Sequence, residues 1–165
     1  MMRLNLMVVV LLAAVNGLTT AARSESPDEW ITLGARVHRG FGTFIPVGIR
    51  IGLDALQRLN AKAREVTVVY YDSDKAPCAC LADGVAIATV ASVGQRTLQI
   101  APEKATVGAM AIIIIRRKQS GEAVKYTVAD SWLPKLAEWN QTLDPRGRYD
   151  AVMKAEGLFD VMPMK

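Results

Sequence analysis

The run of residues 79–93 constrains the fold more than any other part of the chain. It contains no proline and only one glycine, which favours a buried helix of about four turns. Most of its side chains are small: Ala79, Ala82, Gly84, Ala86, Ala88, Ala91 and Ser92. Because small side chains let neighbouring backbones approach closely, we expect this helix at the centre of the fold.

The start of this helix carries two reactive groups, a thiol and a carboxylate. Cys80 falls in the first turn and Asp83 follows three residues later, so the two side chains share one face. A second thiol, Cys78, lies two residues before Cys80. An internal disulfide is disfavoured, because bridging cysteines separated by one residue demands strained backbone geometry. A bound metal, an intermolecular disulfide or free thiols stay open.

The other helices and strands follow from spacing and composition. Apolar residues at helical spacing predict a helix from Ile45 to Leu59, after a glycine-punctuated loop at 37–42. Four short segments are typical of strands. They are 66–71, 97–100, 109–115 and 123–129, the last two forming an antiparallel hairpin around a turn at 118–122. Shorter helices are expected at 30–36, 131–139 (capped by Ser131) and 149–156, with 158–161 extended.

The order of these elements indicates the fold class. It runs helix, strand, helix and then three strands, which predicts an α+β fold. We expect a mixed or antiparallel sheet packed by helices, with short helices at the C-terminus.

The first residues have the layout of a secretory signal peptide. A basic start at Met1–Arg3 precedes the apolar run Leu4–Val15, and small residues before Arg23 offer a cleavage site after Ala22. The apolar run is shorter than the roughly 20 residues that a spanning helix needs, so no permanent membrane anchor is expected. We therefore expect a signal peptide at 1–22 and a single exported domain at 23–165, periplasmic or extracellular.

The charge pattern limits the partners. The formal net charge is only +4, and the densest basic cluster, Arg116–Lys118, stands at a predicted strand end. Nucleic-acid binding requires a basic stripe or a recognised module, neither of which is visible here. We expect no nucleic-acid partner.

Two further motifs connect the chain to a known family. His38 is followed at a fixed distance by Gly48–Gly52 (GIRIG), and Cys80 is followed by Asp83, Thr89, Gly94 and Leu98. At these spacings the chain resembles the formylmethanofuran dehydrogenase E-subunit family, which has an HGHLCPG loop before a GYRMG-like helix and a later CxVDAIQxxTGCTxGKGNL segment. With the closing LFDV at Leu158–Val161, the resemblance covers roughly residues 37–163.

The chain departs from that family where the family is associated with zinc. The family's second histidine and loop cysteine fall on Gly40 and Gly42, and its later Thr-Gly-Cys-Thr portion becomes Thr89-Val90-Ala91-Ser92. Most candidate zinc ligands are therefore absent.

The resemblance leaves His38, Cys80 and Asp83 as candidate metal ligands, with Cys78 as an unmatched reserve. Three protein ligands are the usual number in a catalytic zinc site, which keeps a fourth position open. The sequence identifies no cofactor with certainty, and zinc is the candidate cofactor.

Loss of polar ligands leaves a more apolar pocket, which suits ligand binding better than metal chemistry. We expect this ligand pocket to be formed by His38, Phe44, Cys80 and Asp83. The favoured function is an exported small-molecule or cofactor-binding domain with a degenerate metal site, not itself a formylmethanofuran dehydrogenase.

Two other functions stay open. One is a zinc- or thiol-dependent enzyme that uses His38 and Cys80, since a cysteine and a histidine within hydrogen-bond reach can act together. The other is a structural component of an exported redox complex, for which a homodimer is also open. No catalytic residue is assigned, and whether the chain is an enzyme stays undecided.

Overall fold

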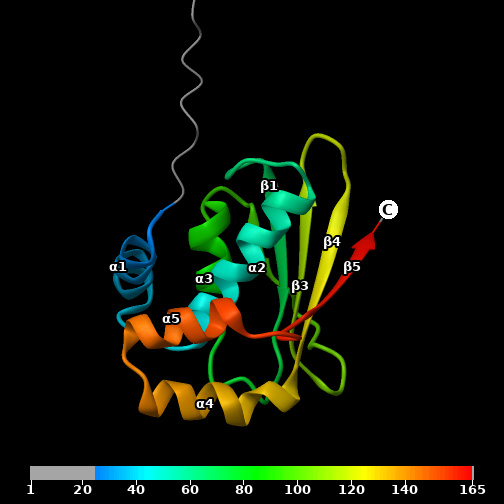
Figure 1. The fold of residues 1–165 in the computed structure, drawn as a ribbon. Helices are drawn as coiled ribbons and strands as arrows, with labels where there is room; N and C mark the ends of the chain where they lie inside the picture. Colours follow the sequence, from blue (N-terminus) through cyan, green and yellow to red (C-terminus); the bar gives the residue numbers. More distant parts are fainter. Residues whose placement is uncertain (1–24, 165) are drawn as a thin grey trace, which may run out of the picture.

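The computed structural model describes residues 25–164, which form one five-stranded sheet with helices beside it (Figure 1). The helices are α1 (Pro27–His38), α2 (Phe44–Arg58), α3 (Cys80–Thr89), α4 (Leu133–Thr142) and α5 (Pro145–Lys154), with a 3-10 turn, η1, at Asp130–Trp132. The strands are β1 (Val66–Tyr71), β2 (Leu98–Ile100), β3 (Ala109–Arg117), β4 (Ala123–Ala129) and β5 (Asp160–Met164). The predicted α+β class is confirmed, while the predicted signal peptide lies outside the described residues.

The sheet has the strand order β2-β1-β3-β4-β5. Only β1 and β2 are parallel, because the chain between them crosses over through α3, whereas the other neighbours are antiparallel. The predicted hairpin of β3 and β4 is confirmed. The C-terminal segment, expected to dock in an extended form, becomes the edge strand β5 with Val161 opposite Tyr126.

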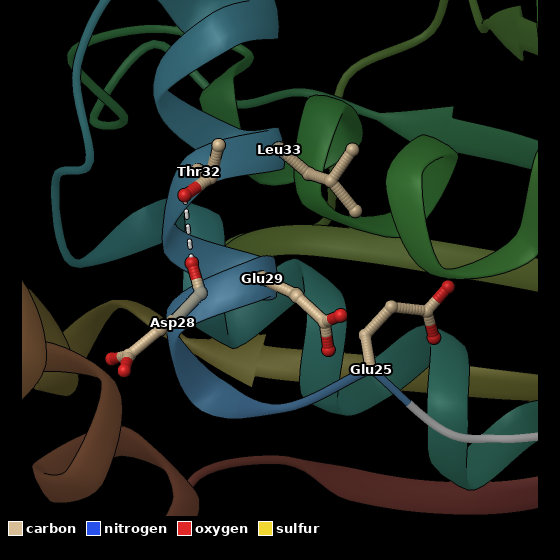
Figure 2. Close-up of a pocket in the computed structure, with 5 residues that line it drawn as sticks. All are labelled: Glu25, Asp28, Glu29, Thr32 and Leu33. Carbon is tan, nitrogen blue, oxygen red and sulfur yellow. Dashed lines mark hydrogen bonds between the residues drawn. The ribbon is translucent and has the colours of Figure 1, made fainter.

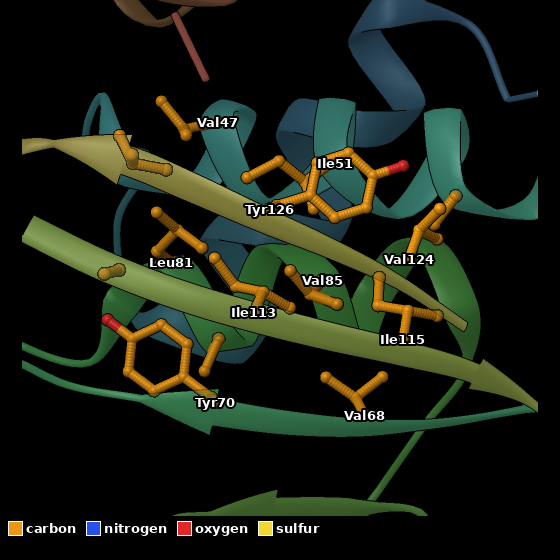
Figure 3. Close-up of a cluster of buried hydrophobic side chains, with 14 of the residues drawn as sticks. Val47, Ile51, Val68, Tyr70, Leu81, Val85, Ile113, Ile115, Val124 and Tyr126 are labelled. Carbon is orange, nitrogen blue, oxygen red and sulfur yellow. The ribbon is translucent and has the colours of Figure 1, made fainter. Parts of the chain in front are cut away.

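The core lies between the sheet and the helices α2 and α3 (Figure 3). Val68 of β1 and Ile113 of β3 pack in one buried cluster with Ile51 of α2 and Val85 of α3. The four consecutive isoleucines predict a strand buried on both faces, but Ile114 is only half-buried. Among the helices within residues 25–164, none has the length and apolar content that crossing a membrane requires.

The backbones of α2 and α3 touch at two glycines. A Cβ atom added to Gly48 would overlap the carbonyl oxygen of Leu81, and one added to Gly84 would overlap that of Ile45. The predicted close approach of small residues is therefore real, and glycine is required at both positions because any side chain would force the helices apart.

The predicted extent of the central helix, 79–93, is wrong at its C-terminal end. Helix α3 stops at Thr89, and Val90 adopts a left-handed conformation with φ of 55°. The Thr89 carbonyl accepts a 2.8 Å hydrogen bond from the Arg64 backbone N–H, in the loop before β1, instead of one from a further helical turn. This long-range bond ends the helix.

The C-terminal helices also differ from their predicted bounds. Ser131 lies within η1 and does not cap α4, which begins at Leu133. Helix α5 begins at Pro145 rather than at residue 149, because the Asp144 carboxylate accepts a 2.7 Å hydrogen bond from the Gly147 N–H and caps it.

We predict that Gly84→Ala lowers the free energy of unfolding by about 1–3 kcal/mol or more, because the new methyl group overpacks the contact between α2 and α3. Urea unfolding followed by circular dichroism measures the change. Gly94→Ala is the matched control, since nothing lies within 4 Å of a Cβ at that position. Equal stability of the two variants would contradict the prediction.

Candidate functional site

His38 is the last residue of α1 and does not belong to the loop in which the sequence predicts it. The helix starts earlier than expected because Ser26 and Glu29 form a capping box. It ends directly after His38, where Arg39 turns into the left-handed region with φ of 65°. Helix α1, which is capped at its start and ends directly after His38, therefore positions the imidazole.

Cys78 and Cys80 form a disulfide, so the expectation that an internal bridge is disfavoured is wrong. Ala79 between them has φ of −74° and ψ of 25°. This turn-like conformation leaves the two Cα atoms 5.2 Å apart, within the usual range for disulfides. Cys78 is half-buried at the surface, whereas Cys80, the first residue of α3, is 5% exposed.

The structure brings His38 and Cys80 together, as predicted. One ring nitrogen of His38 and the sulfur atoms of Cys78 and Cys80 all lie within 4.8 Å of one another. The Nδ1 atom of His38 is also 2.7 Å from Oδ2 of Asp83, which comes from the first turn of α3. The C-terminal end of α1 therefore meets the N-terminal end of α3 at one cluster of polar and sulfur groups.

His38, Cys78 and Cys80 could hold a metal ion. A cysteine binds metal as a thiolate, so the disulfide withdraws two of these three ligands. Asp83 takes the place of a supporting carboxylate, which in metal sites fixes the ring of a ligating histidine. Its predicted role as a direct ligand stays a prediction.

Sequence reasoning gives Cys78 too little weight, because this residue matches no position of the resembling family. The signal that could have found it is the pair of cysteines one residue apart at the start of a helix.

An open groove of about 580 Å³ runs between α1 and α3 and the loop after α3. Its apolar lining includes Leu33 and Val37 of α1, Ile87 of α3, and Val90 and Val93 beyond it. None of His38, Cys78, Cys80 and Asp83 belongs to this lining, although Val37 directly precedes His38 in the sequence and Ala86 follows Asp83 by three residues. Sequence reasoning missed these lining residues because the packing of α1 on α3 is not visible in a local pattern.

Phe44 does not line this groove, and neither do the other three predicted pocket residues, His38, Cys80 and Asp83. Phe44 is the first residue of α2, is half-buried and packs against the buried side chains of both hydrophobic clusters. The structure therefore gives Phe44 a packing role beside the site.

A second hollow, of about 440 Å³, lies at the start of α1 and shares two lining residues, Glu25 and Leu33, with the groove (Figure 2). Glu29 caps the helix, and Asp28 forms a 3.2 Å ion pair with Arg146 of α5. These two carboxylates therefore already serve the fold.

Arg50, in the segment that matches the family's GYRMG-like helix, lies away from the cluster. Its guanidinium donates hydrogen bonds of 2.7 and 2.6 Å to the carbonyl oxygens of Val152 and Ala155, and it sits 5.2 Å from the ring centre of Phe159. This motif residue ties α2 to the C-terminal segment, so its role here is structural.

Comparison with known proteins identifies the family of most of the chain. No curated protein matches the chain. The model of the family described as "FmdE, Molybdenum formylmethanofuran dehydrogenase operon" matches residues 37–157, which is most of the chain and includes His38, both cysteines and Asp83. The resemblance expected from the sequence is confirmed over this range, and the chain belongs to the FmdE family.

Proposed function

We propose that this protein is an exported domain that binds a small molecule with an apolar body in the groove between α1 and α3. The observation that carries the proposal is the groove itself. Its volume of about 580 Å³ falls in the range of small-molecule sites, and apolar side chains form most of its lining.

The exposure of the lining supports this proposal. Val37 and Val93 are 56% and 70% exposed, although burying their side chains would be favourable. Exposed apolar side chains gathered in one groove often mark a binding site. A ligand that covers them gains the free energy of removing that area from water.

The His38–Asp83 pair would bind a polar group of the ligand at one end of the groove. Both side chains are more than a third exposed, and Ala86, one turn after Asp83, lines the groove. The proposal does not include formylmethanofuran oxidation, because two cysteines cannot supply the ligands of an iron–sulfur cluster.

We predict that the double variant Val37→Ser/Val93→Ser binds the apolar dye Nile red about tenfold more weakly, because two apolar contacts are lost. Fluorescence titration measures the dissociation constants. The matched control is Val107→Ser, which changes a fully exposed valine outside the groove. If all three proteins bind the dye equally, the groove is not the binding site.

A second candidate function, a zinc site in the reduced protein, is favoured by the proximity of His38, Cys78 and Cys80. Reduction would restore two thiolates beside the imidazole, which fits a site with three protein ligands. Bound zinc would supply a Lewis acid at this cluster.

We predict that the protein purified without reductant or chelator contains much less than one zinc per chain. Reduction followed by incubation with zinc should raise the zinc content per chain. The variants His38→Ala and Cys80→Ala should both bind less zinc after this treatment, since each removes a ligand. Elemental analysis measures the ratio. Stoichiometric zinc before reduction would show that the thiols, rather than the disulfide, are the native state.

Export is also part of the proposal. Its support is the signal-like layout at the start of the chain and the disulfide, because disulfides persist mainly in oxidising compartments. We predict that the exported protein begins at Arg23, after removal of residues 1–22. Intact-mass analysis and N-terminal sequencing test this, and a membrane-embedded chain that begins at Met1 would refute it.

A further inference from the structure

The Cys78–Cys80 disulfide is poorly suited to a structural role. It closes a loop with a single residue between the cysteines, and a disulfide restricts the unfolded chain less as its loop becomes shorter. It also joins no two separate elements, since Cys80 is the first residue of α3 and Cys78 lies two residues before it. Its position beside His38 and Asp83 indicates a chemical role rather than a structural one.

We propose that this disulfide is a redox centre that oxidises dithiols by thiol–disulfide exchange. The proposal does not rest on the groove, because neither sulfur nor His38 belongs to its lining. The substrate class is a molecule with two neighbouring thiols, and a small disulfide such as glutathione disulfide is the oxidant that restores the centre.

The unequal burial of the two cysteines sets the order of the steps. Cys78 is half-buried and Cys80 is almost wholly buried, so the substrate thiolate attacks the sulfur of Cys78. A bond forms between the substrate sulfur and Cys78, and the Cys78–Cys80 bond breaks. The electron pair passes to Cys80, where the N-terminus of α3 favours the negative charge.

The second thiol of the substrate completes the exchange. It attacks the substrate sulfur of the mixed disulfide, so that the substrate leaves as a disulfide and Cys78 leaves as a thiolate. Two electrons have then moved from the substrate to the protein, and the two substrate protons end on Cys78 and Cys80. The 2.7 Å contact with Asp83 holds the ring of His38 in place beside the two sulfur atoms.

The activity test uses the purified mature protein, a reduced synthetic peptide with two cysteines, and glutathione disulfide. We expect catalytic amounts of the protein to raise the rate of peptide oxidation at least about tenfold over the rate with glutathione disulfide alone. Chromatography of the reduced and oxidised peptide measures this rate. Cys78→Ser and Cys80→Ser should each abolish the acceleration. The proposal is overturned if the protein gives no acceleration or if both serine variants keep it.

A separate measurement tests the order of attack. Cys80→Ser retains the accessible thiol and Cys78→Ser retains the buried one, so the first should form a mixed disulfide with glutathione disulfide at least about tenfold faster. Mass spectrometry gives both rates, and equal or reversed rates overturn the proposed order. Circular dichroism checks folding, and Cys80→Ala replaces Cys80→Ser if the latter is unfolded.

The Cys78→Ser variant separates this inference from the proposed binding function. It should lose the acceleration of peptide oxidation and keep the dye affinity of the parent, because neither sulfur atom lines the groove. Loss of both properties would overturn the independence of the redox centre from the groove.

Discussion

The close contact between the backbones of α2 and α3 is the constraint on which the rest of the structure depends. Gly48 and Gly84 face each other where any side chain would overlap a backbone carbonyl of the other helix. The pair of helices then presents a continuous apolar surface to the sheet, where Ile51 and Val85 meet the buried face of the strands. A wider spacing would open cavities in a core that must be close-packed.

The same contact determines where the candidate site can form. Because α3 is held against α2 along its length, its first turn is fixed, and with it Cys80 and Asp83. Helix α1 supplies the facing group, since His38 stands at its end and bonds to Asp83. The cluster therefore arises where two helix termini meet, while the groove follows the sides of those helices.

The features that sequence reasoning could predict were those set by local composition or by regular spacing. The hairpin of β3 and β4 and the glycine contact of α2 are of this kind. The end of α3 was not predictable, because a backbone bond from Arg64 decides it. The disulfide depends on the conformation of one residue, Ala79, and the groove depends on how α1 lies on α3. Geometry that depends on a long-range contact or on one residue produces no periodic pattern in the sequence, so it could not be predicted.

The shortness of the loop closed by Cys78 and Cys80 has a consequence for how the domain could signal its oxidation state. Opening the bridge releases no distant segment, because the sheet and the contact between α2 and α3 are formed without it. Both states would share one fold and differ only in a small surface area around His38. A molecule that distinguishes the oxidised from the reduced protein must therefore contact that area directly, since no other part of the surface would change.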